Sequence, residues 1–310
     1  MKILITGADG MVGSALCPEL TRHGHDIVPT DLKPSTADTT ALDICDPEAI
    51  RRLLRAAAPG MVIHLAAETD VDRCEQEPAH AYRVNAAGTE GLAAACRDAG
   101  IRLLYVSTAG VFDGRKATPY VETDAPNPIN VYGRSKLAGE IAVRQLPDHL
   151  IVRASWMVGG YERDKKFVGK LLRLLEERRE LSVVTDKIGS LTFTEDMSRG
   201  IASLIDASQT GLFHMANQGV CSRYDVACKM LEYLGRRDVT IRPITSEAFP
   251  LPAPRAASEA MQNQRLQALG LDRMPSWEDA LHAYIQRHLQ APAIYFKTRE
   301  NADCGMRDAE

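Results

Sequence analysis

The stretch "KILITGADGMVG" at residues 2–13 constrains the fold more than any other part of the chain. An apolar run of strand length, residues 2–6, leads directly into Gly7, Gly10 and Gly13, and a helix-like segment follows. Glycines allow a tight turn and a close approach of the backbone to an anion, while the helix N-terminus presents free N–H groups and the positive end of its dipole. The order of strand, glycine turn and helix therefore predicts a pyrophosphate site in a dinucleotide-binding fold.

The first half of the chain repeats the strand and helix alternation. Apolar runs of strand length occur at residues 2–6, 26–30, 61–66, 102–107 and 149–154. Helix-period segments lie between them, one starting with Asp46 as N-cap and Pro47 as first helical residue, and another ending at Gly100. Strands that are apolar on both faces and alternate with helices predict an α/β fold with a doubly wound parallel (Rossmann) sheet.

After Arg153 the alternation becomes less regular, and strand-like and helix-like segments follow one another up to a proline-rich passage at 249–258 and a last helix. We expect a dinucleotide-binding domain over residues 1–153, whose sheet is completed by later segments. Residues 154–290 are expected to form mainly a smaller C-terminal α/β lobe that binds the substrate. Residues 291–310 show little periodicity and are expected to be a flexible tail.

Composition and charge exclude several classes of protein. The chain has 310 residues, of which 45% are hydrophobic and 25% charged, with a formal net charge of −4. Such a balance is typical of a soluble globular protein and gives no electrostatic reason to expect a nucleic acid or membrane partner. The seven cysteines are odd in number and include no CxxC pair. Reduced thiols in a cytoplasmic protein explain them better than a disulfide framework, and no metal-ligand spacing is present.

The end of the second strand bears on the choice of cofactor. Asp31 lies 18 residues after Gly13. An acid in this place can accept hydrogen bonds from the adenosine ribose and would repel a 2′-phosphate, so it favours NAD(H) over NADP(H). Lys33, two residues later, would soften that preference. The alternative for Asp31 is a solvated carboxylate in a turn.

Two further positions fit a dinucleotide at the same edge of the sheet. Asp43 and Ile44 follow a short third strand, where the adenine ring is expected. Ala66 and Ala67 end the strand at 61–66, and their small side chains would let a cofactor lie across the strand end.

The segment "NVYGRSKLAGE" places Tyr132 and Lys136 one helical turn apart. Residues i and i+4 share a helix face, and an ammonium beside a phenol would lower the pKa of the phenol. The pair alone fits an ordinary surface helix equally well. However, the strand at 102–107 ends in Ser107 and Thr108, which completes a Thr108, Tyr132 and Lys136 set at the carboxyl edge of the predicted sheet, where such folds bind ligands. This set is the predicted catalytic site.

These motifs, in this order, resemble the extended short-chain dehydrogenase/reductases. The resemblance rests on "GADGMVG", "HLAAETDVDRCEQEP", "AYRVNAAGTEGLA", "STAGVFDG", "PYVETDAPNPINVYGRSKLAGE" and "IVRASWMVGG". Within that superfamily the chain is most similar to the dTDP-4-dehydrorhamnose reductase family, because segments such as "LSVVTDKIGSLTFTEDMSRGI" and "GLFHMANQGVCSRYDVACKML" resemble its substrate lobe. The likeness covers roughly residues 1–290.

The resemblance implies an NAD(P)H-dependent reductase of a nucleotide-linked 4-keto-6-deoxysugar. Tyr132 would be the proton donor, Lys136 would hold the nicotinamide ribose, Thr108 would lie beside the reacting oxygen, and Trp156 would flank the sugar. The residues that it implies at the dinucleotide are Gly10, Met11, Val12, Asp31, Asp43, Ile44, Ala67, Glu68 and Thr69. A homodimer is the oligomeric state that we consider.

The chain departs from the reductase pattern directly after Thr108. An acid and an aromatic residue are expected there, and the chain has Ala109 and Gly110. With Ala109 in the substrate site, the sugar pocket is expected to be roomier and less polar than in the reductases.

Two other functions stay open at this point. A sugar-nucleotide epimerase shares the Tyr/Lys pair and would retain its NAD through the cycle, and a dehydratase would need an acid pair beside Thr108 that Ala109 and Gly110 do not supply. The reductase family also resembles the non-catalytic regulatory subunit of methionine adenosyltransferase. The intact Thr108, Tyr132 and Lys136 argue against that reading.

Overall fold

A seven-stranded sheet, in which each strand is parallel to its neighbours, forms the centre of the computed structural model, which describes residues 1–290. The strand order is β11-β6-β5-β4-β1-β2-β3. The strands are β1 (Lys2–Thr6), β2 (Asp26–Asp31), β3 (Thr40–Ala41), β4 (Met61–His64), β5 (Arg102–Thr108), β6 (Leu150–Ala154) and β11 (Gly211–His214). The chain winds outward from β1 to one edge and then from β4 to the other, so the predicted doubly wound Rossmann sheet is confirmed.

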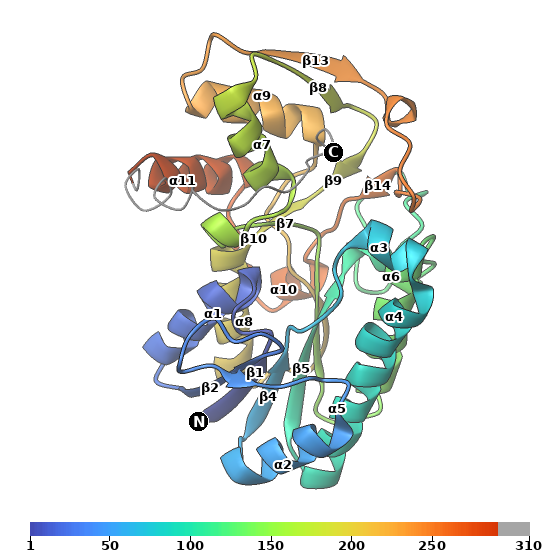
Figure 1. Ribbon diagram of the computed structural model, residues 1–310, viewed down its shortest axis with the longest axis vertical. Helices are drawn as coiled ribbons and strands as arrows, with labels where there is room; N and C mark the ends of the chain where they lie inside the picture. Colours follow the sequence, from blue (N-terminus) through green and yellow to red (C-terminus); the bar gives the residue numbers. More distant parts are fainter. Residues whose placement is uncertain (291–310) are drawn as a thin grey trace.

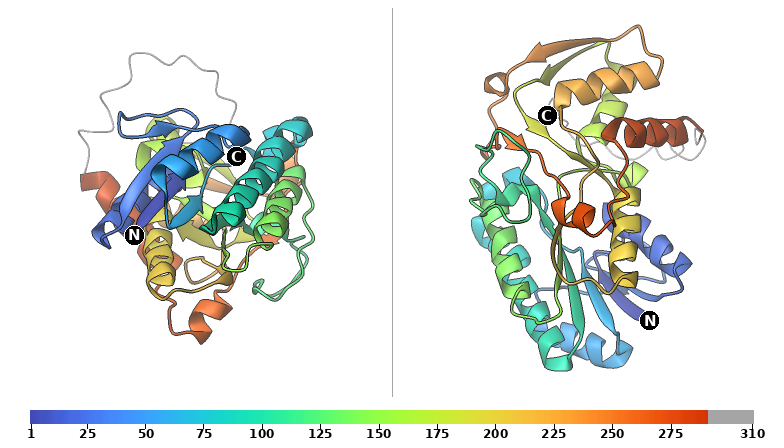
Figure 2. Two further views of the ribbon diagram at one scale, coloured as in Figure 1. Left: turned by 90° about the horizontal axis from the view of Figure 1, so that it is seen from below. Right: turned by 180° about the vertical axis from the view of Figure 1, so that it is seen from behind.

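Helices cover both faces of the sheet (Figure 2). Side chains of α1 (Met11–Arg22) and α8 (Thr194–Asp206) pack with one face in a single buried cluster. On the other face, α2 (Pro47–Ala57), α5 (Thr89–Ala99) and α6 (Val131–Val143) pack in a second cluster. Burial on both faces explains the apolar runs of the central strands β1, β4 and β5. We call the sheet and these five helices the sheet lobe.

Local signals place several of these elements where the sequence predicts them. The Asp46 carboxylate accepts hydrogen bonds from the N–H groups of Glu48 and Ala49, both at 3.0 Å, and so caps α2 ahead of Pro47. At the end of α5, Gly100 has a φ of 66°, a left-handed conformation that glycine adopts without strain. Both predicted helix signals are confirmed.

Two late elements of the chain lie in the sheet lobe. Strand β11 pairs with β6 at the edge of the sheet, and α8 packs against α1. Between β4 and α5 along the chain lie α3 (Val71–Gln76), α4 (Pro78–Tyr82) and a π-helical turn at Arg83–Gly88. The sequence does not predict this π-helical turn.

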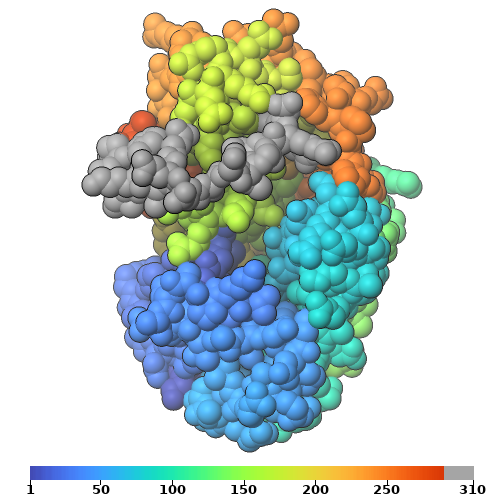
Figure 3. Space-filling model, viewed as in Figure 1, coloured from blue at the N-terminus to red at the C-terminus, as the bar shows by residue number. Residues whose placement is uncertain are grey.

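A small lobe lies above the sheet lobe in Figure 1 and has its own hydrophobic core. Its elements are α7 (Phe167–Glu177), β8 (Glu180–Val184), α9 (Arg223–Tyr233), β13 (Thr240–Ile244) and α11 (Trp277–Gln290). Strands β8 and β13 pair in parallel, and Trp277 is buried in the core as a packing residue. In the space-filling view, the blue and cyan N-terminal segments form the lower part and the later yellow-green and orange segments form the upper part (Figure 3).

Short strands join the two lobes. They are β7 (Trp156–Val158), β9 (Ile188–Gly189), β10 (Leu191–Phe193), β12 (Cys221–Ser222) and β14 (Ser258–Glu259), and α10 (Gln264–Ala268) follows them. Within residues 1–290, no helix has the length and apolar character of a membrane span. The same residues contain no group of three or more His, Cys, Asp or Glu side chains suited to a metal ion. The predicted tail at 291–310 lies outside the described residues.

Candidate active site

The glycine turn has the close backbone packing that its sequence predicts. Gly7 has a φ of 71°, and a Cβ atom there would lie 2.8 Å from the Ala66 nitrogen. At Gly13 a Cβ atom would lie 2.2 Å from the carbonyl oxygen of Ala8. Real side chains do not tolerate such distances, so the turn depends on glycine at both positions. The result is a tight cradle between β1 and α1.

Helix α1 opens toward this cradle without a cap of its own. Gly10 is its N-cap, no side chain caps its first turn, and no acidic residue lies in that turn. Met11 and Val12 are half-buried at the start of the helix. Uncapped N–H groups and the positive helix end attract an anion, so these residues fit the pyrophosphate of a dinucleotide.

Asp31 lies beside the glycine turn at the end of β2. Its Oδ2 atom accepts a hydrogen bond from the Asp9 N–H at 3.2 Å, and its Oδ1 atom accepts one from the Lys33 N–H at 3.2 Å. Asp9 brings a second carboxylate to the same place, where it accepts a hydrogen bond from the Thr39 hydroxyl at 3.0 Å. Two carboxylates therefore surround the end of the cradle where an adenosine ribose would lie.

Asp43 and Ile44 follow β3 as expected, but they differ in exposure. Asp43 is exposed, and its Oδ1 atom accepts a hydrogen bond from the Cys45 N–H at 2.8 Å. Ile44 is buried, and its side chain lies against Gly88 of the π-helical turn. Because the Ile44 side chain packs inward, only a small part of its surface can contact a ligand.

The loop after β4 carries Ala66, Ala67, Glu68 and Thr69, which are half-buried except for the exposed Thr69. The Glu68 carboxylate is engaged by Arg73 and His80 at 3.0 and 3.2 Å. The Glu68 carboxylate is therefore engaged within the protein, and the backbone, the two alanines and the exposed Thr69 remain to line a cofactor.

Asn85 holds the loop after β4 against the catalytic helix, and the sequence prediction missed it. Its Oδ1 atom accepts a hydrogen bond from the Glu68 N–H at 2.8 Å, and its Nδ2 atom donates to the Glu68 carbonyl and the Ser135 hydroxyl at 3.0 Å. Asn85 is buried in the π-helical turn, and such turns are frequent at functional sites. A signal for it is the motif "AYRVNAAGTEGLA" itself, which carries the resemblance and contains this asparagine.

His64, at the end of β4, is a packed residue. Its ring is fully buried, with Nδ1 2.7 Å from the Thr6 hydroxyl and Nε2 3.1 Å from the Thr89 hydroxyl. Burial lowers the pKa of His64 to about 3, so the ring is neutral at physiological pH.

The segment at 159–166 reaches from the small lobe to both loops of the cradle. Arg163 Nε donates to the Asp9 carbonyl at 2.9 Å, and Lys166 Nζ donates to the Thr69 carbonyl at 3.1 Å. These contacts tie the small lobe to the nucleotide side of the sheet lobe. The sequence analysis did not single out either basic residue.

The predicted catalytic hydroxyls meet at the carboxyl end of β5. Helix α6 starts at the Asn130 cap, whose Oδ1 accepts from the Gly133 N–H at 2.8 Å. A Cβ atom at Gly133 would lie 2.0 Å from the Gly110 carbonyl oxygen, so glycine lets α6 press against the exit of β5. In that position the phenol of the half-buried Tyr132 forms a hydrogen bond with the Thr108 side chain, which lowers the pKa of the phenol.

Lys136 is also buried at this site, but it does not act on Tyr132 as predicted. Its Nζ donates to the Val106 carbonyl at 2.8 Å and lies 4.1 Å from the centre of the Tyr105 ring. Burial lowers the pKa of Lys136 to about 7. The pKa of Tyr132 is raised, because burial outweighs the Thr108 hydrogen bond and Lys136 is not among the groups that shift it. The expectation that Lys136 lowers the pKa of the phenol is therefore wrong for this structure.

A buried ion pair joins β6 to α6 one helical turn after Lys136. Arg153 Nε and Nη2 donate to the two carboxylate oxygens of Glu140 at 2.8 and 2.7 Å, and both side chains are fully buried. Glu140 lies one helical turn after Lys136, and its negative charge favours the protonated lysine. The sequence analysis did not identify this pair, although the spacing from Lys136 to Glu140 was visible.

Trp156 is the first residue of β7, and its expected place beside the sugar stays a prediction. A Cβ atom at Gly189 would lie 2.5 Å from the indole ring, so that glycine makes room for it. The Arg223 guanidinium lies 4.4 Å from the ring centre. The indole Nε1 donates to Glu259 Oε2 at 2.7 Å. Sequence reasoning did not identify Glu259, because no motif of the first 153 residues points to it.

The expectation for Ala109 requires a correction. Its side chain is 1% exposed and packs in a cluster with Val111, Phe112 and Tyr120, so it offers no surface to a sugar. The neighbouring Gly110 is the position that faces the catalytic hydroxyls. A Cβ atom there would lie 3.4 Å from Thr108 Oγ1 and 3.6 Å from Tyr132 Cδ1. Because these are ordinary van der Waals distances, they show no extra room at Gly110, and the roomier sugar pocket stays a prediction.

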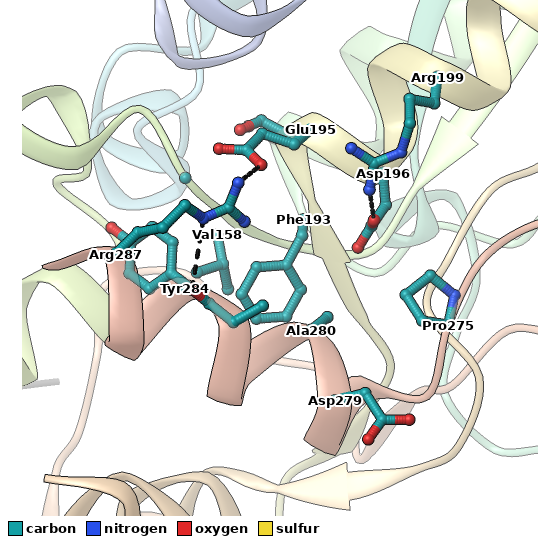
Figure 4. Close-up of a pocket in the computed structure, with 13 residues that line it drawn as sticks. Val158, Phe193, Glu195, Asp196, Arg199, Pro275, Asp279, Ala280, Tyr284 and Arg287 are labelled. Carbon is teal, nitrogen blue, oxygen red and sulfur yellow. Dashed lines mark hydrogen bonds and ion pairs between the residues drawn. The ribbon is translucent and has the colours of Figure 1, made fainter. Parts of the chain in front are cut away.

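A separate cavity of about 210 Å³ lies between α8 and α11 (Figure 4). Arg287 pairs with Glu195 and Arg199 with Asp196, while Asp279 accepts a hydrogen bond from the Ser276 hydroxyl. None of the predicted catalytic residues lines it. The cavity therefore adds nothing to the chemistry at Thr108 and Tyr132.

Known proteins resemble this chain over nearly its whole length. The family described as RmlD substrate binding domain matches residues 1–290. A dTDP-4-dehydrorhamnose reductase of Mycobacterium tuberculosis (strain CDC 1551 / Oshkosh) is 39% identical over 287 residues, which cover 90% of this chain and 91% of the relative.

Solved structures of such reductases have the same fold. The crystal structure of a dTDP-4-dehydrorhamnose reductase from Clostridium acetobutylicum ATCC 824 superposes with a TM-score of 0.87 at 36% identity, covering 93% of this chain and 100% of that chain. A dTDP-4-dehydrorhamnose reductase from Bacillus anthracis str. Ames, in complex with NADP, has a TM-score of 0.86 at 37% identity and covers 92% of this chain and 99% of that chain.

Proposed function

This chain belongs to the RmlD substrate binding domain family, which includes the dTDP-4-dehydrorhamnose reductases, and we propose that it reduces the keto group of a nucleotide-linked 4-keto-6-deoxysugar, with dTDP-4-dehydrorhamnose as the first candidate. The observation that carries the proposal is the meeting of Thr108 and Tyr132 beside the glycine cradle at the carboxyl edge of the sheet. The similarity of the chain to reductases along both lobes supports the same conclusion.

In this proposal each catalytic side chain has one task. A reduced nicotinamide cofactor, when bound, supplies the hydride. Tyr132 donates its phenolic proton to the carbonyl oxygen of the sugar as that oxygen gains negative charge. Thr108 donates a hydrogen bond to the same oxygen and so stabilises the developing alkoxide. Lys136, held at the Val106 carbonyl, binds the ribose next to the nicotinamide.

Burial of Tyr132 fits the role of an acid. Because burial raises the pKa of its phenol, the proton is present on Tyr132 over the whole physiological pH range. The proton leaves only when the reacting oxygen becomes more basic than the phenolate. Trp156 would pack against the sugar from the opposite side.

We propose NADH as the preferred cofactor. The support is the carboxylate of Asp31, joined by that of Asp9, beside the expected position of the ribose. Both carboxylates would repel a 2′-phosphate, while the exposed Lys33 and Arg163, which donates to the Asp9 carbonyl, would attract it. The Bacillus anthracis relative is bound to NADP, so the preference of this chain has to be measured directly.

A reductase fits the observations better than the other two functions considered. This chain lacks the acid pair that a dehydratase would need beside Thr108, because Ala109 is apolar and packed into the core. A non-catalytic subunit would have no need for Thr108, Tyr132 and Lys136 in this arrangement.

We further propose a cytoplasmic homodimer. The free thiols among the described residues support the cytoplasmic location, and light scattering of the purified protein would test the dimer.

The deciding experiment measures NADH oxidation with dTDP-4-dehydrorhamnose and with its UDP-linked counterpart. We expect steady turnover that requires added NADH in stoichiometric amounts, and a Tyr132→Phe variant that binds NADH but is nearly inactive. An epimerase would instead be purified with tightly held NAD and would interconvert sugars without net oxidation of NADH. That result, or inactivity with both sugars, would contradict the proposed function.

A further inference from the structure

We propose that Glu259 recognises the sugar, by accepting a hydrogen bond from the ring hydroxyl next to the keto carbon. The inference rests on the proposed function and adds a specificity-determining residue to it. It would make the small strand β14, at the junction of the two lobes, part of the substrate site.

The backbone of Glu259 is fixed from two sides. Strand β14 pairs in parallel with β9, so that Glu259 lies opposite Gly189. The Ser155 hydroxyl donates to the Glu259 carbonyl at 2.9 Å. A residue held by both contacts has a defined position, although it is more than 120 residues from the catalytic tyrosine in the chain.

One carboxylate oxygen of Glu259 is held by a hydrogen bond, and the other has no hydrogen-bond donor among the described residues. Oε2 accepts a hydrogen bond from the Trp156 indole at 2.7 Å, and the indole is held between Gly189 and the Arg223 guanidinium. For Oε1 we find no hydrogen-bond donor among residues 1–290. Trp156 thus positions a half-buried carboxylate that keeps one oxygen available. A carboxylate oxygen is a strong acceptor for a hydroxyl group.

The carboxylate lies on the reacting side of the site. Thr108 of β5 pairs with Ala154 of β6, and the next residue, Ser155, donates its hydroxyl to the Glu259 carbonyl, so the Glu259 backbone lies close to the exit of β5. The negative charge of Glu259 is also among the groups that raise the pKa of Tyr132. Ala109 and Gly110 offer no polar side chain from the exit of β5. Glu259 is therefore the acidic group that this chain presents beside Tyr132 and Trp156.

The chemistry of the substrate selects the hydroxyl. In a 4-keto-6-deoxyhexose linked to a nucleotide through C1, the ring hydroxyls are at C2 and C3. Tyr132 has to reach the oxygen at C4 to donate its proton. A carboxylate next to Tyr132 is then closest to the C3 hydroxyl, the direct neighbour of the keto carbon. A site that hydrogen-bonds a substrate hydroxyl rejects analogues without it more strongly than an apolar pocket does.

The test uses the full chain with Glu259→Gln and Glu259→Ala, and Glu247→Gln as a matched control on the exposed surface of the small lobe. Kinetic constants are measured with dTDP-4-dehydrorhamnose and with its 3-deoxy analogue, and Kd is measured for dTDP and NADH. With the intact sugar we expect kcat/KM to fall roughly tenfold or more in both Glu259 variants, mainly through KM. With the 3-deoxy analogue the variants should match the wild type, and the Kd values of dTDP and NADH should not change.

Other outcomes would show whether the inference about Glu259 or the proposed function is wrong. Equal losses with both sugars would show that Glu259 acts only by holding Trp156, and a Trp156→Phe variant would then reproduce them. Unchanged kinetics in both Glu259 variants would show that the carboxylate does not reach the sugar. Each of these results overturns the inference while the wild type remains an active reductase. A wild type that binds dTDP and NADH but reduces neither sugar would instead refute the proposed function, and the inference with it.

Discussion

The nucleotide side and the sugar side of the candidate site are built in different ways. The expected nucleotide side consists mainly of strand ends and loops within the first 108 residues, joined by Lys136 from α6, and its key feature is the backbone of one short turn, with Gly7 and Gly13. The proposed sugar side would be assembled from side chains on separate short strands, such as Trp156 and Glu259, with Gly189 making room for the indole. The first side depends on close backbone packing that leaves no room for a side chain, and the second depends on contacts between distant segments.

This difference has a consequence for variation. A glycine turn with no free space cannot change without losing its ligand. A sugar side made of side chains from several segments can exchange one polar contact for another while the fold stays intact. The absence of an acid at Ala109 and the presence of one at Glu259 are an example within this chain.

The largest effect on turnover is expected at Tyr132, where the nucleotide side and the sugar side of the site meet. Tyr132→Phe should reduce turnover by ~10²–10⁴-fold and leave the affinity for NADH unchanged, because the phenolic proton is needed only in the transition state. Steady-state kinetics and NADH titration would measure the two quantities. Tyr82→Phe, at an exposed position of α4, is the control. A Tyr132→Phe variant with near-normal turnover would mean that another group donates the proton.

A pair of glycine variants would test the contrast between the two sides directly. Gly13→Ala places a Cβ 2.2 Å from the Ala8 carbonyl oxygen, so it should weaken NADH binding and folding by about 1–3 kcal/mol. In Gly110→Ala the closest contact is 3.4 Å, to Thr108 Oγ1, and the free energy of unfolding should change by less than about 0.5 kcal/mol. Calorimetry and denaturant unfolding would measure both. Similar losses in the two variants would refute the contrast.

The buried His64 should make the sheet lobe sensitive to acid. Its pKa is about 3 in the folded protein, below the ordinary value of 6.5, so between these pH values only the unfolded state binds the proton. Stability is therefore lost as the pH falls from 6.5 toward 3, and this residue alone should remove about 2 kcal/mol at pH 5. Denaturant unfolding of the wild type and of His64→Gln between pH 7 and pH 4 would show it. If both proteins lose stability with the same slope, the prediction fails.

The smallest effect concerns the choice between cofactors. Asp31→Ser removes one carboxylate from the expected ribose position, so the preference for NADH over NADPH should fall by about 1 kcal/mol, or roughly fivefold. The ratio of kcat/KM values for the two cofactors is the measurement, and Asp26→Ser at the exposed start of β2 is the control. A wild type that strongly prefers NADPH would show that Asp31 does not meet the ribose in this way.

Much of the fold and part of the site followed from the sequence because they depend on local or periodic patterns. The apolar runs predicted β1, β2, β4, β5 and β6 nearly to the residue, since a strand buried on both faces must be apolar throughout. Asp46 and Gly100 marked helix ends because capping is a local interaction.

The sequence by itself determined the Rossmann sheet, the glycine cradle and the candidate set of Thr108, Tyr132 and Lys136. Only the tertiary structure decided that Lys136 points to β5 and leaves the pKa of Tyr132 raised, and that Ala109 packs into the core. It also brought Glu259 into contact with Trp156 from a segment about 100 residues later in the chain. The physical reason is that burial and electrostatic environment are set by every segment that packs around a group. Strand and helix periodicity, by contrast, is written in a few consecutive residues.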